Sequence, residues 1–303
     1  MNSSVCGLIV TRNRLNSLKR TIQGLLIQTY PIDTIIIVDT DSTDGTKEYL
    51  SQPNLPVSLQ VILQENIGGA GGFHIGLQEF RSRCFEWCWL MDDDGWPSPD
   101  ALEKLEPGKV ESPFWRNSLV INSENRLELA FELPINSVST KSVNIVKTAI
   151  TSINFANPFN GTLIHKNIVN NIGLPIPELF IKGDETEYQK RAVRRGFDVQ
   201  TYSHSEFFHP AQREKDICEV SNSRVWIYYY KVRNIGAELD ENGCLVFDPS
   251  SAYRLASSYI CDIMNAYFAR RISLLDSLNR VWVVLSGVLA AMVNIPFRWF
   301  VPK

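Results

Sequence analysis

The chain has 303 residues, of which 44% are hydrophobic and 21% are charged, a composition typical of a folded soluble protein. This length accommodates one large domain, or one core domain with an appendage. The formal net charge of −3 provides no basic footprint for nucleic acid and argues against that class of partner. The six cysteines are scattered, and no signal-peptide pattern precedes them. We therefore expect reduced thiols in a cytoplasmic protein.

The N-terminal half alternates short apolar runs with amphipathic stretches. Strands are predicted over residues 5–10, 35–38, 57–63 and 85–91. Helices are predicted over residues 15–28, 46–50 and 68–82. Short apolar strands that alternate with helices predict a Rossmann-like α/β fold, with a mainly parallel sheet covered on both faces.

Polar residues follow these predicted strands directly. Thr11, Asp39, Asn66 and Asp92 each stand just after an apolar run. Because ligands of such sheets bind beyond the carboxyl ends of the strands, we expect one cleft to collect these four side chains.

The triplet Asp92-Asp93-Asp94 closes the fourth apolar run. Adjacent carboxylates repel one another until a cation neutralises them. Mg²⁺ and Mn²⁺ prefer carboxylate oxygens and usually complete their coordination with substrate phosphates. The triplet therefore indicates a divalent metal site, and the alternative is a solvated acidic turn.

A glycine cluster, Gly68-Gly69-Ala70-Gly71-Gly72, precedes the third predicted helix. Its spacing differs from the dinucleotide-binding fingerprint, and it lacks the lysine of a P-loop. Glycines before a helix permit close approach of the backbone to an anionic ligand. A flexible turn is the alternative interpretation.

Four segments occur in a characteristic order: Thr11-Arg12-Asn13-Arg14, Val38-Asp39 with Ser42 to Thr46, Asn66 to Phe73, and Trp89 to Asp94. Over residues 3–212 the chain resembles the inverting glycosyltransferases of family 2, which have a GT-A fold. The asparagine-glycine segment followed by a triple aspartate is most similar to the galactofuranosyltransferase branch. Thr40 and Asp41 depart from the pattern, because asparagine usually follows the strand-end aspartate and glycine or asparagine comes next.

The resemblance implies roles for the matched residues. Thr11, Arg12 and Arg14 flank the nucleotide, and Asp39 accepts a hydrogen bond from the uracil or ribose. Asn66 and Gly69 line the path of the nucleotide sugar. Asp92 and Asp94 are the outer positions of the DxD metal motif, and Asp93 faces the sugar.

Acidic residues also begin a later predicted helix, at Asp184, Glu185 and Glu187. Acids in a first helical turn complement the helix dipole, which is the structural interpretation. In the resembling family this segment holds the catalytic base, which accepts the proton of the acceptor hydroxyl. Alignment on Glu187-Tyr188 favours Glu185 as the base, with Asp184 as the alternative.

Histidine is scarce, and His209 stands at a predicted strand end. The resembling enzymes use a histidine there as a third metal ligand beside the DxD motif. A structural role is the alternative for His209, and His204 is the second candidate ligand.

The last third of the chain differs in character, and we expect a domain boundary near residues 215–216. Aromatic residues near Arg233 indicate either a sugar or pyrophosphate cleft or the packing of a helix. From Tyr253 onward the spacing is helical, and residues 281–293 are nearly all apolar. This run is shorter than the ~20 residues that span a bilayer. It predicts a buried helix of a small C-terminal bundle, or an amphipathic membrane-surface attachment supported by Trp282, Phe297 and Trp299.

Together these features predict an inverting glycosyltransferase that depends on Mn²⁺ or Mg²⁺. The expected donor is UDP-galactofuranose. The expected acceptor is a saccharide of a cell-surface polysaccharide such as O-antigen or capsule, either free or carried on a polyprenyl diphosphate. We expect a cytoplasmic protein, either free or peripheral on the cytoplasmic face of the inner membrane. The alternatives are a rhamnosyltransferase using dTDP-rhamnose and a nucleotide-sugar-binding partner without catalysis.

Overall fold

The computed structural model describes residues 3–52, 59–109, 111, 113–135, 138–148, 155, 157, 159–211, 216–240 and 242–293. The chain forms two compact units. The first unit comprises Met1–Pro175 and Ala192–Gln212, and the second comprises Ile176–Arg191 and Arg213–Lys303. The predicted boundary near residue 215 lies close to this division, and residues 176–191 additionally group with the C-terminal part of the chain.

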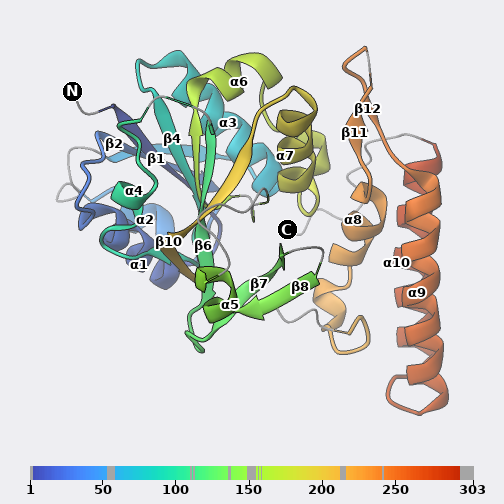
Figure 1. Cartoon of the computed structure of the whole chain (residues 1–303). Coiled ribbons are helices and arrows are strands. Elements are labelled where there is room, and N and C mark those ends of the chain that lie inside the picture. The colour runs from blue at the N-terminus through green and yellow to red at the C-terminus, as the bar shows by residue number, and fades with distance from the viewer. Residues whose placement is uncertain are drawn as a thin grey trace. The chain divides into compact units, whose positions relative to one another are not determined.

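A ten-stranded sheet forms the centre of the first unit (Figure 1). Its strands are β1 (Val5–Thr11), β2 (Thr34–Thr40), β3 (Leu59–Gln64), β4 (Trp87–Asp92), β5 (Trp96–Pro97), β6 (Trp115–Asn122), β7 (Glu128–Ile135), β8 (Val138–Ser142), β9 (Asn160–His165) and β10 (Val199–His209). The main order is β3-β2-β1-β4-β9-β6-β10-β5. Strands β1 to β4 are parallel, as is the pair β6 and β10. β9 runs antiparallel to both β4 and β6.

Helices cover both faces of this sheet. They are α1 (Leu15–Leu26), α2 (Thr46–Leu50), α3 (Gly68–Ser82), α4 (Ala101–Lys104), α5 (Val143–Thr148) and α6 (Lys166–Ile172). Val5 and Ile9 of β1 share a core with residues of α1 and α4. Leu8 and Val10 lie against the glycines of α3. Because side chains alternate along a strand, α1 and α3 must cover opposite faces.

The structure confirms the predicted α/β arrangement. α3 has the predicted bounds, 68–82, while α1 ends at Leu26, before the predicted residue 28. β4 begins at Trp87, two residues after the start of the predicted run. β3 begins at Leu59, and residues 57–58 of that prediction lie outside the described residues.

The second unit is mainly helical. Its elements are two 3₁₀ turns (Pro177–Leu179 and Asn222–Arg224), the start of α7 (Asp184–Arg194), α8 (Ile227–Asn234), β11 (Glu238–Leu239), β12 (Leu245–Val246), α9 (Pro249–Phe268) and α10 (Leu274–Met292). Asp248 caps α9, since its carboxylate accepts from the amides of Ser250 and Ser251 at 3.0 and 3.1 Å.

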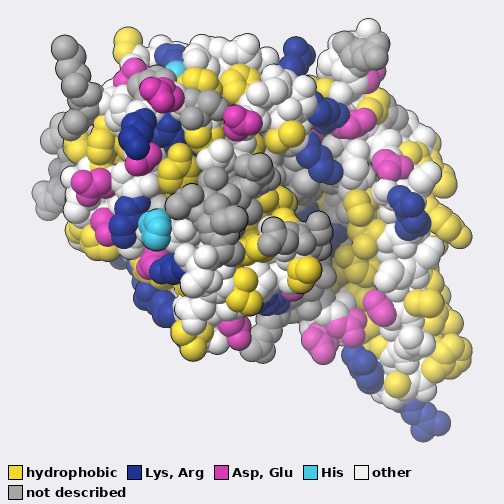
Figure 2. Space-filling model, in the orientation of Figure 1, with side chains coloured by type: hydrophobic (Ala, Val, Ile, Leu, Met, Phe, Trp, Pro, Cys, Tyr) yellow, Lys and Arg dark blue, Asp and Glu magenta, His cyan; other side chains and the backbone are white. Residues whose placement is uncertain are grey.

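One face of α10 is buried, as the bundle prediction requires. Val283, Val284 and Ala291 on that face are at most 3% exposed. Its other face is apolar too, with Leu275 77% and Trp282 56% exposed. Within the described chain α10 alone meets the length and hydropathy expected of a membrane span, and half of that stretch is buried. Figure 2 shows hydrophobic side chains gathered over the α9–α10 hairpin, with basic side chains at its tip.

Candidate active site

Residues predicted to form one cleft lie at the same edge of the first unit's sheet. The strand register pairs Thr11 of β1 with Asp39 of β2, and Val10 of β1 with Asp92 of β4. Asn66 lies two residues after the end of β3, and its Oδ1 accepts from the amide of Gly68 at 3.3 Å. Parallel strands end together at their carboxyl edge, and this is where such sheets bind ligands.

Asp93, the middle acid of the triplet, points back toward the end of β1. Its Oδ2 accepts from the hydroxyl of Thr11 at 2.7 Å and from the amide of Arg12 at 3.3 Å. The residue is 6% exposed. Burial raises the pKa of Asp93 to about 6, although Arg14 and Thr11 act in the opposite direction. Asp93 thus binds the end of β1 in this structure, and its contact with the sugar stays a prediction.

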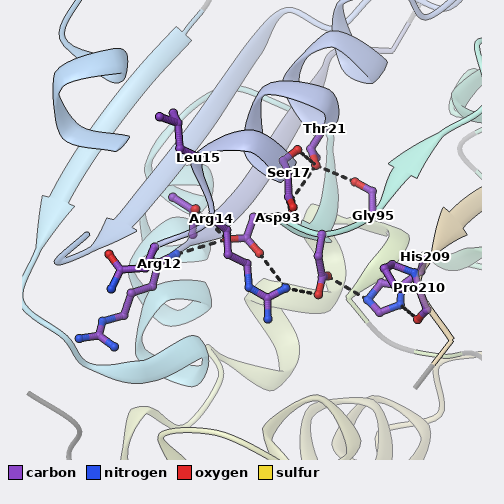
Figure 3. Close-up of polar contacts among 12 residues, drawn as sticks. Arg12, Arg14, Leu15, Ser17, Thr21, Asp93, Gly95, His209 and Pro210 are labelled. Carbon is purple, nitrogen blue, oxygen red and sulfur yellow. Dashed lines mark hydrogen bonds and ion pairs between the residues drawn. The ribbon is translucent and has the colours of Figure 1, made fainter. Parts of the chain in front are cut away.

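Asp94 contacts two groups from distant segments, Arg14 and His209, both labelled in Figure 3. Arg14 makes an ion pair with Asp94 Oδ2, and His209 Nε2 lies 2.9 Å from Asp94 Oδ1. Burial acts to raise the pKa of Asp94, but His209 and Arg14 outweigh it and hold this pKa well below its usual range. Burial acts to lower the pKa of His209, yet Asp94 more than offsets it, so this pKa is raised.

The orientation of His209 follows from its position at the end of β10. Its Nδ1 lies 2.6 Å from the carbonyl oxygen of Pro210, which accepts, so Nδ1 carries a proton. This bond directs Nε2 toward Asp94. The structure thus confirms that His209 ends a strand, and it brings His209 to the acidic triplet across more than 100 residues.

Thr21 of α1 fixes the acidic turn, a role that the sequence did not indicate. Its hydroxyl lies 2.7 Å from the carbonyl oxygen of Gly95 and 3.1 Å from that of Asp93. Gly95 itself has no room for a side chain, because an added Cβ would lie 2.2 Å from Phe207. A lone threonine inside an amphipathic helix carries no sequence signal that distinguishes this contact.

Asp39 is fully buried, and only one of its two carboxylate oxygens accepts a hydrogen bond from the described residues. Its Oδ1 accepts from the amide and the hydroxyl of Ser42, at 3.0 and 2.5 Å. Its buried Oδ2 has no hydrogen-bond partner among the described residues. A buried carboxylate oxygen normally accepts a hydrogen bond. An N–H or hydroxyl group of a ligand at this end of β2 would supply the missing donor.

Glycines of α3, inside the cluster and beyond it, differ in what surrounds them. An added Cβ at Gly72 would lie 2.4 Å from Val10, and at Gly76 one would lie 2.3 Å from Leu8. These two glycines therefore let α3 approach β1 closely. At Gly69 no atom lies within 4 Å of an added Cβ, so this position faces open space, and its role on the donor path stays a prediction.

The departure at Asp41 also has a structural explanation. Asp41 has a φ of 68°, in the left-handed region where glycine and asparagine are common. Lys47 contacts its carboxylate at 2.8 Å. Asp41 therefore adopts the left-handed backbone conformation that the glycine or asparagine usual at this position would adopt.

The donor set of the predicted metal ligands fits a hard divalent cation. Asp92 and Asp94 offer carboxylate oxygens, which suit Mn²⁺ and Mg²⁺, and His209 offers an imidazole nitrogen, a transition-metal ligand that favours Mn²⁺. Among the described residues, however, no three acidic, histidine or cysteine side chains are grouped closely enough to form a ligand cluster. In this structure the carboxylate of Asp94 contacts Arg14 and His209. A bound cation would take over the neutralisation of its negative charge.

The predicted catalytic acids belong to the second unit, at the start of α7. Asp184 is 4% exposed. Glu187 is 1% exposed and makes two bonds to Arg191, at 3.0 and 2.7 Å. Glu185 is half-buried, and its carboxylate makes no hydrogen bond or ion pair with the described residues. Of the three acids, Glu185 is therefore the one whose carboxylate is both accessible and uncommitted.

The loop that leads into α7 is held by the end of α8. The side-chain amide of Asn234 donates to the carbonyls of Leu179, Ile181 and Lys182 at 2.8, 3.0 and 2.7 Å. Arg233, which is fully buried, donates to Glu178 and Leu179. Arg233 thus has the packing role rather than the cleft-lining one. In the sequence this pair follows a run of tyrosines, and nothing there indicates that its side chains bond to residues 52 to 55 positions earlier.

Solved structures share the fold. A mannosyltransferase from Pyrobaculum calidifontis, in complex with GDP-Man and Mn²⁺, superposes with a TM-score of 0.56 at 15% identity, covering 97% of this chain and 88% of that one. GalNAc-T7 with UDP, GalNAc and Mn²⁺ gives a TM-score of 0.56 at 15% identity, covering 79% of this chain and 49% of that one. At such identities these likenesses establish the fold alone.

Sequence relatives identify the family. Residues 7–107 match the family described as glycosyl transferase family 2. Galactofuranosyltransferase GlfT1 of Mycobacterium tuberculosis (strain ATCC 25618 / H37Rv) is 30% identical over 223 residues, which span 69% of this chain and 71% of that protein. GlfT1 of Mycolicibacterium smegmatis is 29% identical over 214 residues, which span 68% of this chain and 70% of that protein. The chain belongs to glycosyl transferase family 2, resembles its galactofuranosyltransferases, and is a glycosyltransferase with a GT-A fold.

Proposed function

We propose that this glycosyltransferase moves galactofuranose from UDP-galactofuranose to a saccharide acceptor of a cell-surface polysaccharide. The proposal is supported by the similarity to GlfT1 over two thirds of both chains. The observation that carries it is the meeting of Asp94, Arg14 and His209 at the carboxyl edge of the sheet. This edge is where a nucleotide sugar binds in a sheet of this kind.

The donor site is proposed to include Thr11, Arg12, Arg14, Asp39, Asn66, Gly69, Asp92 and Asp93. The unpartnered Oδ2 of Asp39 suits a hydrogen bond from the uracil or ribose. Asp92, Asp94 and His209 would hold Mn²⁺ or Mg²⁺. A bound divalent cation offsets the negative charge that develops on a departing nucleoside diphosphate.

Glu185 is proposed to act as the general base. The acceptor hydroxyl attacks the anomeric carbon on the face opposite the departing diphosphate, and the carboxylate takes the hydroxyl proton. One displacement of this kind inverts the configuration without a covalent glycosyl-enzyme intermediate. The uncommitted carboxylate of Glu185 supports this role, whereas Asp184 is buried.

A donor-hydrolysis screen tests the proposal. The full chain is incubated with Mn²⁺ and a panel of nucleotide sugars that includes UDP-galactofuranose and dTDP-rhamnose, and the released nucleotide is measured. We expect release from UDP-galactofuranose above all others, and loss of that release in EDTA. Selective release from dTDP-rhamnose would make the chain a rhamnosyltransferase. No release from any donor, with UDP still bound, would favour a binding partner without catalysis.

We also propose that the enzyme is peripheral on the cytoplasmic face of the membrane, where a polyprenyl-diphosphate-linked acceptor would be found. The exposed apolar face of α10 and the exposed arginines Arg270 and Arg271 that precede it support attachment to anionic lipid. Phe297 and Trp299 lie outside the described residues. Flotation with anionic vesicles tests this: Leu275→Ser should release the protein, whereas Leu127→Ser, which is 68% exposed in the first unit, should not.

A further inference from the structure

The contact of Arg14 with the acidic triplet goes beyond the role of this residue in the proposed donor site. Arg14 is the N-cap residue of α1, just beyond the carboxyl end of β1. One nitrogen of its guanidinium, Nη1, makes the ion pair with Asp94 Oδ2 and lies 3.7 Å from Asp93 Oδ1. Figure 3 shows the Arg14 side chain directed toward Asp93 and that of Arg12 directed away from it. The chain itself thus supplies a positive charge to the triplet.

All three acids of the triplet act on the charge of Arg14. Burial acts to lower the pKa of its guanidinium, but Asp94, Asp93 and Asp92 more than offset this effect, so the pKa is raised. Of the two groups at Asp94, His209 can remain beside a bound metal ion, because a neutral imidazole is itself a ligand. A guanidinium stays charged and offers no lone pair to a metal ion. Since like charges repel, Arg14 and a divalent cation at Asp94 exclude each other.

The backbone around Arg14 is fixed, whereas its side chain is free to turn. The amide of Asn13 donates to the hydroxyl of Ser42 at 2.9 Å. The amide of Leu15 donates to the carboxylate of Asp44 at 2.9 Å. The Arg14 side chain is 44% exposed, and its Nε and Nη2 make no hydrogen bond with the described residues. This edge of the guanidinium can donate to two oxygens of a phosphate group at once.

We propose that Arg14 occupies the place of the divalent cation at Asp94 while the donor site is empty, and moves to the diphosphate when a nucleotide binds together with its metal ion. The proposal rests on the proposed donor site and adds an exchange of partners by one side chain. Without a nucleotide, Arg14 competes with the metal ion for Asp94 and weakens metal binding. With a diphosphate present, Arg14 has a second anionic partner and releases Asp94, so the nucleotide strengthens metal binding and the metal strengthens nucleotide binding.

Titration of Mn²⁺ into the nucleotide-free full chain tests the competition. Arg14→Met removes the charge and should bind Mn²⁺ about fivefold more tightly than the parent chain, the factor expected for the loss of one exposed ion pair. Arg14→Lys retains a positive charge and should bind Mn²⁺ within about twofold of the parent chain. Arg12→Met is the matched control, because Arg12 makes no ion pair with the described residues, and it should also stay within about twofold. Thermal unfolding confirms that each variant is folded.

Titration of UDP at saturating Mn²⁺ tests the move to the diphosphate. Arg14→Met should bind UDP about tenfold more weakly, since a charge-assisted hydrogen bond contributes about that factor. The opposite signs of the two effects separate an exchange of partners from a structural role, in which removal of Arg14 would weaken the binding of both Mn²⁺ and UDP.

Three results would overturn the proposal. Arg14→Met that binds Mn²⁺ no more tightly than the parent chain, or no more tightly than Arg12→Met, would show that Arg14 does not compete with the metal ion. Unchanged binding of UDP by Arg14→Met would show that Arg14 does not move to the diphosphate. A parent chain that binds no UDP in the presence of Mn²⁺ would instead refute the proposed donor site, and with it the exchange.

Discussion

Replacing Asn234 with alanine should uncouple the start of α7 from the rest of the second unit. The side-chain amide has two N–H groups, which are shared among three carbonyl oxygens at 2.7 to 3.0 Å. Two full hydrogen bonds contribute about 2 kcal/mol net, and carbonyls left buried without a donor add up to about 2 kcal/mol more. We therefore expect Asn234→Ala to lower the free energy of unfolding by about 2 to 4 kcal/mol.

The same change should lower catalysis more than donor binding. Asp184 and Glu185 directly follow the loop that Asn234 holds, so kcat for transfer should fall about tenfold or more, while KM for the nucleotide sugar changes little. Asn234→Asp, which supplies no N–H group, should be at least as damaging as alanine.

Urea unfolding and steady-state kinetics measure both effects. Asn171→Ala is the matched control, because that exposed residue donates a single bond, at 2.7 Å, to Asn167. The control should change stability by less than about 0.5 kcal/mol. If Asn234→Ala matches the control in stability and retains full kcat, the loop does not depend on Asn234 and the reasoning is wrong.

Three further predictions concern the first unit. Gly76→Ala, whose Cβ would lie 2.3 Å from Leu8, should lose about 1 to 3 kcal/mol of stability, whereas Gly69→Ala should be neutral or gain up to about 1 kcal/mol; equal urea midpoints would contradict this contrast. The pKa of Asp93, about 6 against an ordinary 3.8, means that its ionised form destabilises the fold above pH 6. Asp93→Asn in EDTA should therefore be more stable than the parent chain at pH 8, by at most about 3 kcal/mol, and this gain should vanish below about pH 4; a pH-independent difference would refute the assignment. Thr21→Val removes a hydroxyl donated to the acidic turn and should cost about 1 to 2 kcal/mol in thermal unfolding, and an unchanged Tm would show that the turn does not need it.

Much of the fold was predictable because its signals are local. Apolar β-branched runs gave β1 and β2, and the spacing of leucines gave α1. The mixed part of the sheet was less accessible. β9 inserts antiparallel between β4 and β6, which are far from it in sequence, and no local pattern encodes that pairing.

The candidate site divides in the same way. Thr11, Asp39 and the triplet were identifiable because each stands at the carboxyl end of an apolar strand, and the strand ends of a parallel sheet coincide. The orientation of Asp93 was not, since it depends on the desolvation of its carboxylate and on the hydroxyl of Thr11 from another strand. The hold of Asn234 on the loop before α7 likewise depends on a distant contact.

The central claim is that the acidic end of β4 binds a nucleotide diphosphate through a divalent cation. Titration of UDP into the full chain with Mn²⁺, and again in EDTA, tests it most directly. The parent chain and Asp100→Asn, whose carboxylate pairs with Lys104 on α4, should bind UDP only when Mn²⁺ is present, and Asp94→Asn should weaken that binding by about a hundredfold. Binding of UDP by Asp94→Asn with the affinity of the parent chain, or equal binding in EDTA, would contradict the claim.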